Sequence, residues 1–377
     1  MRKVLLAVLL CLFVASGAFA YAEPEPVRIG VFLPLTGQVA WGGQLELEGV
    51  QLAHQVFPTV LDRPIELFVV DNRSDRVEAA LAVTRLIEHY NVVAIIGTYG
   101  SAFAMAGGEV AMRHGIPVMA TSATNPLVTR DNPFYFRACF IDPFQGAAAA
   151  NFVYHDLGIR RVATLVDISA DYSIGLGNFF RQNFVRLGGE IVSDMRYNSG
   201  DLDFTAQLTE IMARGAELVY IPSYFAEGAL IMKQARELGA EFLFLGGDAM
   251  DHPNVVELGG DAVEGFMFTT FGYDLELPDM NPMAQKFTDL WLSMHPDRIP
   301  SAFVALGFDA YILVLDAITR AGSTVPQEIR DAMAATKDVP TVTGMTTLNY
   351  YGDAEKELAI MKIIDGQRRF HALVHPE

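Results

Sequence analysis

Cysteine is scarce in this chain of 377 residues, which contains only Cys11 and Cys139. Cys11 lies in an apolar N-terminal segment that we expect to be removed, so the remaining protein cannot form an internal disulfide. Its stability must therefore come from hydrophobic cores, for which the apolar fraction of 51% is sufficient. Cys139 lies beside Ala138 and Phe140, which predicts a buried thiol rather than a reactive one.

Positive charge is also scarce. The chain has 27 Lys and Arg against 45 Asp and Glu, which gives a formal net charge of -18. So acidic a surface repels nucleic acid and anionic membranes, and this excludes both classes of partner. The histidines lack the close spacing of metal ligands. They are scattered along the chain, as at His54, His114, His155 and His252. No metal and no other cofactor is expected.

The first twenty residues are typical of a secretory signal peptide. Two basic residues precede an apolar run from Val4 to Val14, and Ala18-Phe19-Ala20 offers a cleavage site. An uncleaved membrane anchor is the alternative, because Val4 to Ala20 is about the minimum length for a bilayer span. We expect cleavage of residues 1–20 and an extracytoplasmic, periplasmic protein. No other segment is expected to be long and apolar enough to cross a bilayer.

Short apolar runs alternate with helical patterns along the remaining roughly 355 residues, which are more than one core normally serves. In the first half, strands are predicted at 27–33, 65–71, 92–97 and 117–121, with helices at 44–57, 76–90 and 101–114. The pattern restarts with helices at 144–157, 174–187, 204–214 and 227–238, and strands at 162–167, 190–197, 218–222 and 242–246. Repeated βα units predict two similar doubly wound, Rossmann-like α/β lobes with mostly parallel sheets. Further on, residues 284–321 predict two helices. Residues 350–366 predict a hairpin, with Asp353 at its turn and a strand at 358–364.

Polar and aromatic residues follow several of the predicted strands. They are 35–37 with Trp41, 98–101, 121–124, 223–224 and 247–248. In open α/β sheets, ligands bind beyond the carboxyl ends of the strands. Two lobes whose edges face each other therefore predict a cleft for a small molecule between them.

Several sequence pieces match a known family in their order and spacing. They are 29–37 (IGVFLPLTG), 96–101 (IGTYGS), 115–126 (GIPVMATSATNP), 171–175, 203–205 (DFT), 234–239 (QARELG) and 307–311 (GFDAY). From Val27 to about Gly366 the chain resembles the periplasmic leucine/isoleucine/valine-binding proteins of ABC transporters, which have the type I periplasmic-binding fold. The resemblance implies a three-stranded hinge between the lobes. Lobe one would comprise 26–142 and 273–348, and lobe two 143–272 and 349–377.

The resemblance also implies how an amino acid would be held. Ser101, at the start of a helix, Thr124 and the backbone of Ser122 would bind the ligand's carboxylate. Asp248 would pair with its ammonium group, because a desolvated ammonium needs an ionised partner. The residues alone leave simpler readings open, since Ser101 could be a plain helix cap and Asp248 a solvated loop residue.

Aromatic residues complete the implied site. Tyr172 and Tyr224 would lie in the cleft on lobe two, and the wall around the ligand's side chain would combine Trp41, Tyr99, Tyr172 and Phe303. Ordinary core packing is the alternative for each of these aromatic residues. No further acid or base is placed beside this wall, which favours a branched-chain or other apolar amino acid.

A binding protein is the favoured function class, with an ABC permease as its partner and a monomer as its state. A hydrolase built on Ser101 and His114 lacks the G-x-S-x-G elbow. A dinucleotide site at Gly175-Leu-Gly177 has Phe180 where the third glycine is needed. The chain is therefore expected not to be an enzyme. The alternative is a sensor that presents an amino acid or amide to a receptor.

Overall fold

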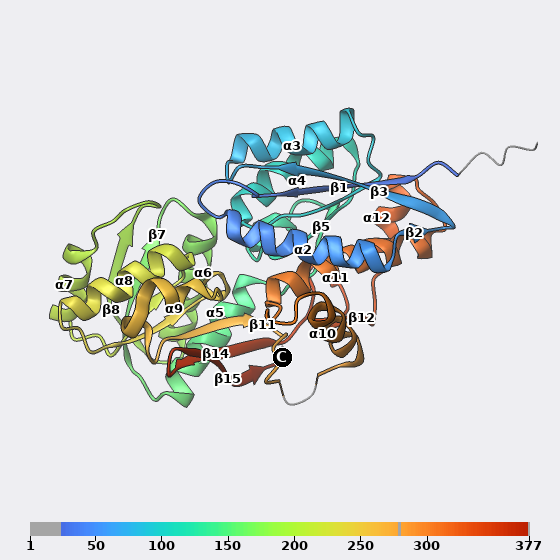
Figure 1. The fold of residues 1–377 in the computed structure, drawn as a ribbon. Helices are drawn as coiled ribbons and strands as arrows, with labels where there is room; N and C mark the ends of the chain where they lie inside the picture. The colour runs from blue at the N-terminus through green and yellow to red at the C-terminus, as the bar shows by residue number, and fades with distance from the viewer. Residues whose placement is uncertain (1–23, 278–279, 376–377) are drawn as a thin grey trace, which may run out of the picture.

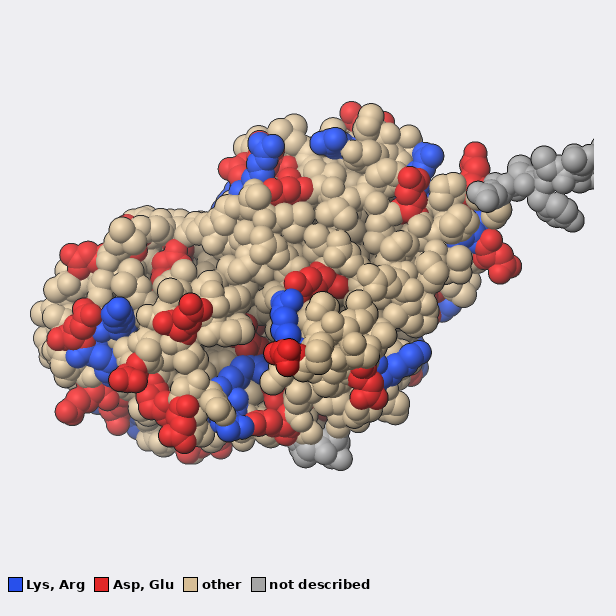
Figure 2. All heavy atoms as spheres, in the orientation of Figure 1, with Lys and Arg blue, Asp and Glu red and all other residues tan. Residues whose placement is uncertain are grey.

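The chain folds into two α/β lobes that lie side by side (Figure 1). This computed structural model describes residues 24–277 and 280–375. The predicted signal peptide, residues 1–20, therefore lies outside the described residues. On the face drawn in Figure 2, acidic and basic side chains are interspersed over both lobes.

The first lobe is built on a six-stranded sheet. Its strand order is β2 (Thr59–Val60), β3 (Arg63–Asp71), β1 (Val27–Leu33), β4 (Ala94–Ile96), β5 (Val118–Ala120) and β6 (Tyr135–Arg137). All pairings are parallel except that of β2 with β3. Six of the seven residues of β1 are buried, as expected for a central strand covered on both faces.

The second lobe is built on a seven-stranded sheet. Its order is β15 (Gln367–Val374), β14 (Leu358–Ile364), β11 (Met267–Phe271), β10 (Leu243–Gly246), β9 (Leu218–Ile221), β7 (Arg161–Asp167) and β8 (Glu190–Tyr197). The strands from β7 to β11 pair in parallel, whereas β14 and β15 add an antiparallel hairpin at the edge. A separate hairpin joins β12 (Val339–Thr341) to β13 (Gly344–Thr346).

Helices cover both faces of each sheet (Figure 1). On the first lobe, α3 (Arg76–Glu88) and α4 (Ser101–His114) lie on one face, and α2 (Ala40–Val56) and α11 (Ala302–Ala321) on the other. On the second lobe, α5 (Asp142–Asn151) and α6 (Asp171–Arg186) lie opposite α7 (Thr205–Ala213), α8 (Phe225–Glu237) and α9 (Asn254–Gly259). Helices α10 (Pro282–Met294) and α12 (Pro326–Ala334) complete the described set. This arrangement confirms the predicted fold class.

Buried ion pairs tie together the segments that pass between the lobes. The Arg137 guanidinium, at the end of β6, lies 2.7 Å from the Asp353 carboxylate, and both side chains are buried. The Lys356 ammonium lies 3.4 Å from Asp309 on α11. The prediction that the hairpin turns at Asp353 is therefore wrong, because the turn lies at residues 365–366. Asp353 belongs instead to a segment that passes between the lobes. The predicted lobe boundaries stay predictions.

Two helices of the first lobe pack with almost no space between their backbones. A β-carbon added to Gly307 of α11 would lie 2.0 Å from the Glu46 carbonyl oxygen of α2. One added to Gly49 of α2 would lie 1.9 Å from the Val304 carbonyl oxygen of α11. Contrary to expectation, α11 is long and apolar enough to span a membrane. However, 83% of its most apolar stretch of 18 residues is buried inside the protein. Its apolar sequence therefore serves the core, where Cys139 also lies fully buried as predicted.

Candidate functional site

A small cavity lies where the carboxyl edges of the two sheets face each other. It is narrow, with room for little more than a water molecule. The residues that line it are Tyr99, Gly100, Ser101, Ser122, Thr124, Tyr172, Tyr224, Asp248 and Ala249. Seven of the nine predicted site residues are among them, from both halves of the chain. The structure thus brings most of the predicted site together at the predicted strand ends.

The lobes touch across this cavity, so the structure shows a closed cleft. The Gln38 amide donates to the Glu227 carboxylate at 2.6 Å, and the Arg76 guanidinium lies 2.7 Å from Asp171. The Asn125 amide also donates to the backbone oxygen of Asp171 at 3.0 Å. These contacts join the first lobe to helices α6 and α8 of the second.

The first lobe presents three hydroxyl-bearing residues to the cavity. Ser101 is the first residue of α4 and follows Gly100, whose φ of 89° lies in the left-handed region that favours glycine. The Ser101 hydroxyl accepts from the backbone N–H of Asn125 at 3.3 Å and does not cap its own helix. Ser122 and Thr124 follow β5, and the buried Thr124 hydroxyl has no hydrogen-bond partner among the described residues. This edge combines a helix N-terminus with a free hydroxyl, which suits an anion.

Behind this edge lies a fully buried acid, Glu46 of α2. Its carboxyl group accepts from the Thr121 hydroxyl at 2.5 Å and from the Ser122 hydroxyl. Burial raises the pKa of Glu46 from 4.5 to about 8, although these hydroxyl donors lower it in part. Glu46 is therefore largely uncharged at neutral pH, and it leaves the adjacent edge free of negative charge.

Replacement of Glu46 should reveal this buried proton through the pH dependence of stability. Because the folded-state pKa lies above the unfolded one, Glu46 destabilises the fold increasingly as pH rises from about 4.5 to about 8. Glu46→Gln cannot ionise, so its melting temperature should rise relative to the unsubstituted protein between about pH 5 and about pH 8. The linked free energy is on the order of 4 kcal/mol. Glu48→Gln, on the same helix but partly exposed beside Arg298, is the control. A difference that stays constant with pH would contradict an uncharged Glu46.

The second lobe presents a buried carboxylate, Asp248, just beyond the end of β10. The Gln145 amide donates to its Oδ1 at 2.8 Å and the Tyr172 hydroxyl at 2.9 Å. Burial raises the pKa of Asp248 to about 6, and these two donors limit the rise. Asp248 is thus mostly ionised at neutral pH, with no cationic partner provided by the described residues around the cavity. Such a carboxylate is suited to pair with a cationic ligand group.

Tyrosine rings span the cavity between these two polar edges. Tyr224 caps the start of α8, and its ring centroid lies 5.9 Å from that of Tyr99 and 5.6 Å from that of Tyr172. The Tyr99 hydroxyl is buried without a hydrogen-bond partner in the described parts of the chain. The cavity therefore joins an anion-binding edge, a carboxylate and an aromatic wall.

Comparison with known proteins agrees with this geometry. Residues 26–368 match the family described as periplasmic binding protein. The chain belongs to the periplasmic binding protein family. The resemblance drawn from sequence is therefore confirmed, and the architecture of two lobes around a cleft is that of the family.

Solved and curated relatives cover nearly the whole binding protein. A leucine binding protein LivK from Thermotoga maritima is 41% identical, with a TM-score of 0.90 over 93% of this chain and 99% of that one. LivJ from Streptococcus pneumoniae, solved in complex with isoleucine, is 29% identical, with a TM-score of 0.87 over 93% of this chain and 100% of that one. A Leu/Ile/Val-binding protein homolog from Brucella melitensis is 28% identical over 94% of this chain and 96% of its own. The proteins named here are binding proteins.

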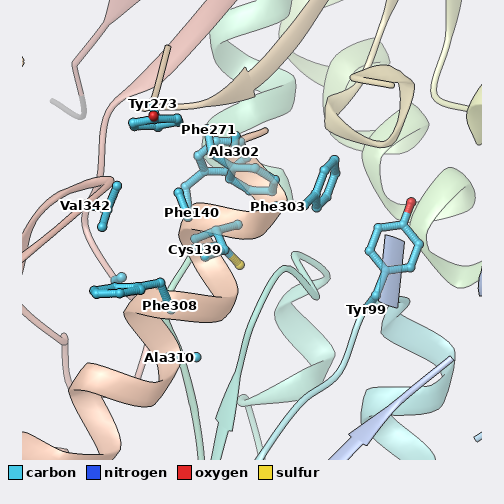
Figure 3. Packing of buried hydrophobic residues seen from close by; sticks show 14 of the residues in the cluster. Tyr99, Cys139, Phe140, Phe271, Tyr273, Ala302, Phe303, Phe308, Ala310 and Val342 are labelled. Carbon is cyan, nitrogen blue, oxygen red and sulfur yellow. The ribbon is translucent and has the colours of Figure 1, made fainter. Parts of the chain in front are cut away.

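Two predicted residues, Trp41 and Phe303, lie behind the cavity of this binding protein rather than on its lining. Phe303 is fully buried at the start of α11, and its ring centroid lies 5.5 Å from that of Tyr99 (Figure 3). Trp41 packs on Tyr99 at 5.1 Å, and it also reaches the second lobe, where Phe225 lies at 4.8 Å and His252 at 4.7 Å. Trp41 thus forms part of the contact between lobes.

Sequence reasoning missed Glu46 and Gln145, which hold the cavity residues from behind. Glu46 lies on the same helical face as Gly42, Gly49 and Val50, all buried. Gln145 is buried with Ala148 on α5. A polar residue on the apolar face of a predicted helix was the available signal, because a buried polar group needs a partner. Among the described residues there is no cluster of His, Cys, Asp and Glu that could hold a metal.

Proposed function

We propose that this chain is an extracytoplasmic solute-binding protein that captures a small apolar α-amino acid, branched-chain in the first instance, and does not catalyse a reaction. The observation that carries the proposal is the opposition of two kinds of group across one closed cavity. Hydroxyls at a helix N-terminus lie on one lobe, and the Asp248 carboxylate lies on the other. A zwitterionic α-amino acid carries the two complementary charges.

The carboxylate end would bind the first lobe. Ser101 lies at the positive end of α4, and a helix N-terminus stabilises an anion by backbone N–H groups and the helix dipole. The Thr124 hydroxyl is buried without a partner among the described residues, so a ligand oxygen would satisfy it. The uncharged state of Glu46 supports this assignment, because an ionised Glu46 beside Ser122 would repel the ligand's carboxylate.

The ammonium end would bind Asp248. Gln145 and Tyr172 both donate to one oxygen of this carboxylate, Oδ1, and hold it in a fixed orientation. The Tyr224 ring closes over the same space next to Tyr172. An ionised acid fixed by neutral donors provides the buried counter-charge that a desolvated ammonium requires.

The side chain of the ligand would meet the aromatic wall. Tyr99 and Tyr224 line the cavity, with Trp41 and Phe303 packed behind Tyr99. The cavity is narrow in this closed form, which restricts the ligand to a small molecule. The names of the LivK and LivJ relatives, which refer to leucine and isoleucine, support a branched-chain side chain.

Closure of the lobes would complete the site and signal occupancy. The ligand would dock on the first lobe through Ser101 and Thr124, and the second lobe would then bring Asp248 and Tyr224 onto it. Closure is favoured only by contacts that the open form lacks, including those of Trp41 with Phe225 and His252. The closed monomer would then deliver its ligand to an ABC permease in the membrane.

Melting temperatures measured against a ligand panel test this proposal. The protein is first unfolded and refolded to remove any carried-over ligand. L-Leucine, L-isoleucine and L-valine at about a hundred times Kd should stabilise the fold by about 2.7 kcal/mol, seen as a shift of a few degrees. Isobutylamine and benzoate, each of which lacks one of the two charged groups, are the matched controls. A shift with benzoate alone would contradict the role of Asp248, and no shift with any amino acid would overturn the ligand class.

A further inference from the structure

A second fully buried acid, Asp142, lies beside the cavity and belongs to none of the predicted roles. It is the first residue of α5, where the chain enters the second lobe after β6. Neither of its carboxyl oxygens has a hydrogen-bond partner in the described parts of the chain. Its backbone N–H donates to the carbonyl oxygen of Thr124 at 3.0 Å. Asp142 therefore joins the carboxylate-binding edge of the first lobe to the base of the second.

The groups that face Asp142 come from several elements of both lobes. The titratable or charged ones are Arg137, Tyr172, Tyr220, Tyr224 and Asp248. Burial raises the pKa of each of these tyrosines, so all three are uncharged at neutral pH. The Arg137 guanidinium is already bound to Asp353 and to the backbone oxygen of Ala123. No free positive charge among the described residues is thus available to Asp142.

An ionised carboxylate in this position would be unstable. A buried charge without a donor or counter-ion costs several kcal/mol, and the group binds a proton instead. Burial, followed by the charge of Asp248, raises the pKa of Asp142 well above its usual range, although the nearby Thr124 hydroxyl and the charge of Arg137 lower it in part. A ligand ammonium would offset the charge of Asp248, but the larger cause, burial, would remain.

The open cleft would give Asp142 the opposite surroundings. Separation of the lobes would move Thr124 away from Asp248 and Tyr220 and would admit water between them. Asp142 would then be a solvated acid in the first turn of a helix, where the macrodipole favours the ionised form. We propose that Asp142 takes up one proton when the cleft closes on its ligand. This inference rests on the proposed amino-acid-binding function.

Neutral pH separates this proton from those of the other two buried acids. At about pH 7, Asp248 is mostly ionised and Glu46 mostly protonated, because their pKa values are about 6 and about 8. Glu46 also contacts only residues of the first lobe, so closure leaves its surroundings in place. Proton uptake at this pH therefore reports chiefly on Asp142.

Calorimetric titration with L-isoleucine, in buffers of different ionisation enthalpy at about pH 7, measures the protons taken up on binding. The full refolded protein should take up close to one proton per ligand, and its Kd should rise about tenfold per pH unit around neutrality. Asp142→Asn mimics the protonated acid, so it should bind at least as tightly at pH 7, take up no proton and lose the pH dependence. Glu48→Gln, which removes a partly exposed acid of α2, is the matched control and should keep the uptake.

The remaining outcomes distinguish a failure of the role of Asp142 from a failure of the proposed function. Binding of L-isoleucine without proton uptake, or equal uptake by Asp142→Asn, would overturn the role of Asp142 and leave the proposed function intact. If Asp142→Asn misfolds, the pH dependence of Kd in the unsubstituted protein still decides, because a flat profile excludes the uptake. No binding heat with L-isoleucine, L-leucine or L-valine would overturn the proposed function and this inference with it.

Discussion

Asp248→Ala should weaken the binding of L-isoleucine by about 3–5 kcal/mol, which is roughly a hundred- to several-thousandfold in Kd. The carboxylate is 2% exposed and lies on the cavity wall, so a ligand ammonium there would lose its water without gaining a counter-ion. Calorimetric titration of the refolded protein at about pH 7.5 measures the effect, since Asp248 is ionised at that pH.

Two further variants show whether the charge itself is responsible. Asp248→Asn keeps the shape of the side chain and an oxygen for Gln145 and Tyr172, but not the charge, so it should lose most of the same affinity. Asp261→Asn removes an exposed acid of the same lobe and should leave Kd within a factor of two or three. Near-normal binding by Asp248→Asn would exclude an ion pair, and equal binding by Asp248→Ala would remove Asp248 from the site.

Gly307→Ala should destabilise the fold by about 3 kcal/mol or more, the largest effect on stability expected here. The added β-carbon would lie 2.0 Å from the Glu46 carbonyl oxygen, and neither helix backbone can yield as a flexible side chain would. In an open helical position the same change stabilises by about 1 kcal/mol, so the sign of the effect is diagnostic. Thermal or urea unfolding of the ligand-free protein measures it.

The same substitution also tests how the helix pair supports the site. Glu46 contacts Thr121 and Ser122, so separation of α2 from α11 should weaken ligand binding as well as stability. Thr319→Ala, at an exposed position of α11, is the control and should change stability by less than about 0.5 kcal/mol. A stabilised Gly307→Ala would show that the two helices do not pack as described.

Local patterns in the sequence predicted much of the fold. The alternation of apolar strands with helical periods located β1, β3, β7, β8, β9 and β10 to within a few residues. Periodicity reports which residues share a face of one element, and this information lies within about ten residues of chain. It placed the hairpin turn wrongly at Asp353, because the buried partner of that acid, Arg137, is more than two hundred residues away.

The cavity residues were foreseen because polar residues at strand ends converge on one edge of a parallel sheet, and because the order of the motifs matched a family. The residues that support the cavity from behind, Glu46 and Gln145, were not predicted. Glu46 meets Thr121 across 75 positions of sequence, and Gln145 meets Asp248 across 103. No local pattern encodes such pairings, which depend on how whole helices pack against the strand ends.

The sequence by itself determined the acidic composition, the scarcity of cysteine, the α/β class and the polar strand ends, since each depends on residue type and short spacing. Tertiary structure alone decided which of those residues are desolvated. Burial and long-range neighbours make Glu46 uncharged, leave Asp142 without a partner among the described residues, and turn Trp41 toward the opposite lobe. The charge of a buried group depends on its surroundings in space, and these exist only once distant segments have packed together.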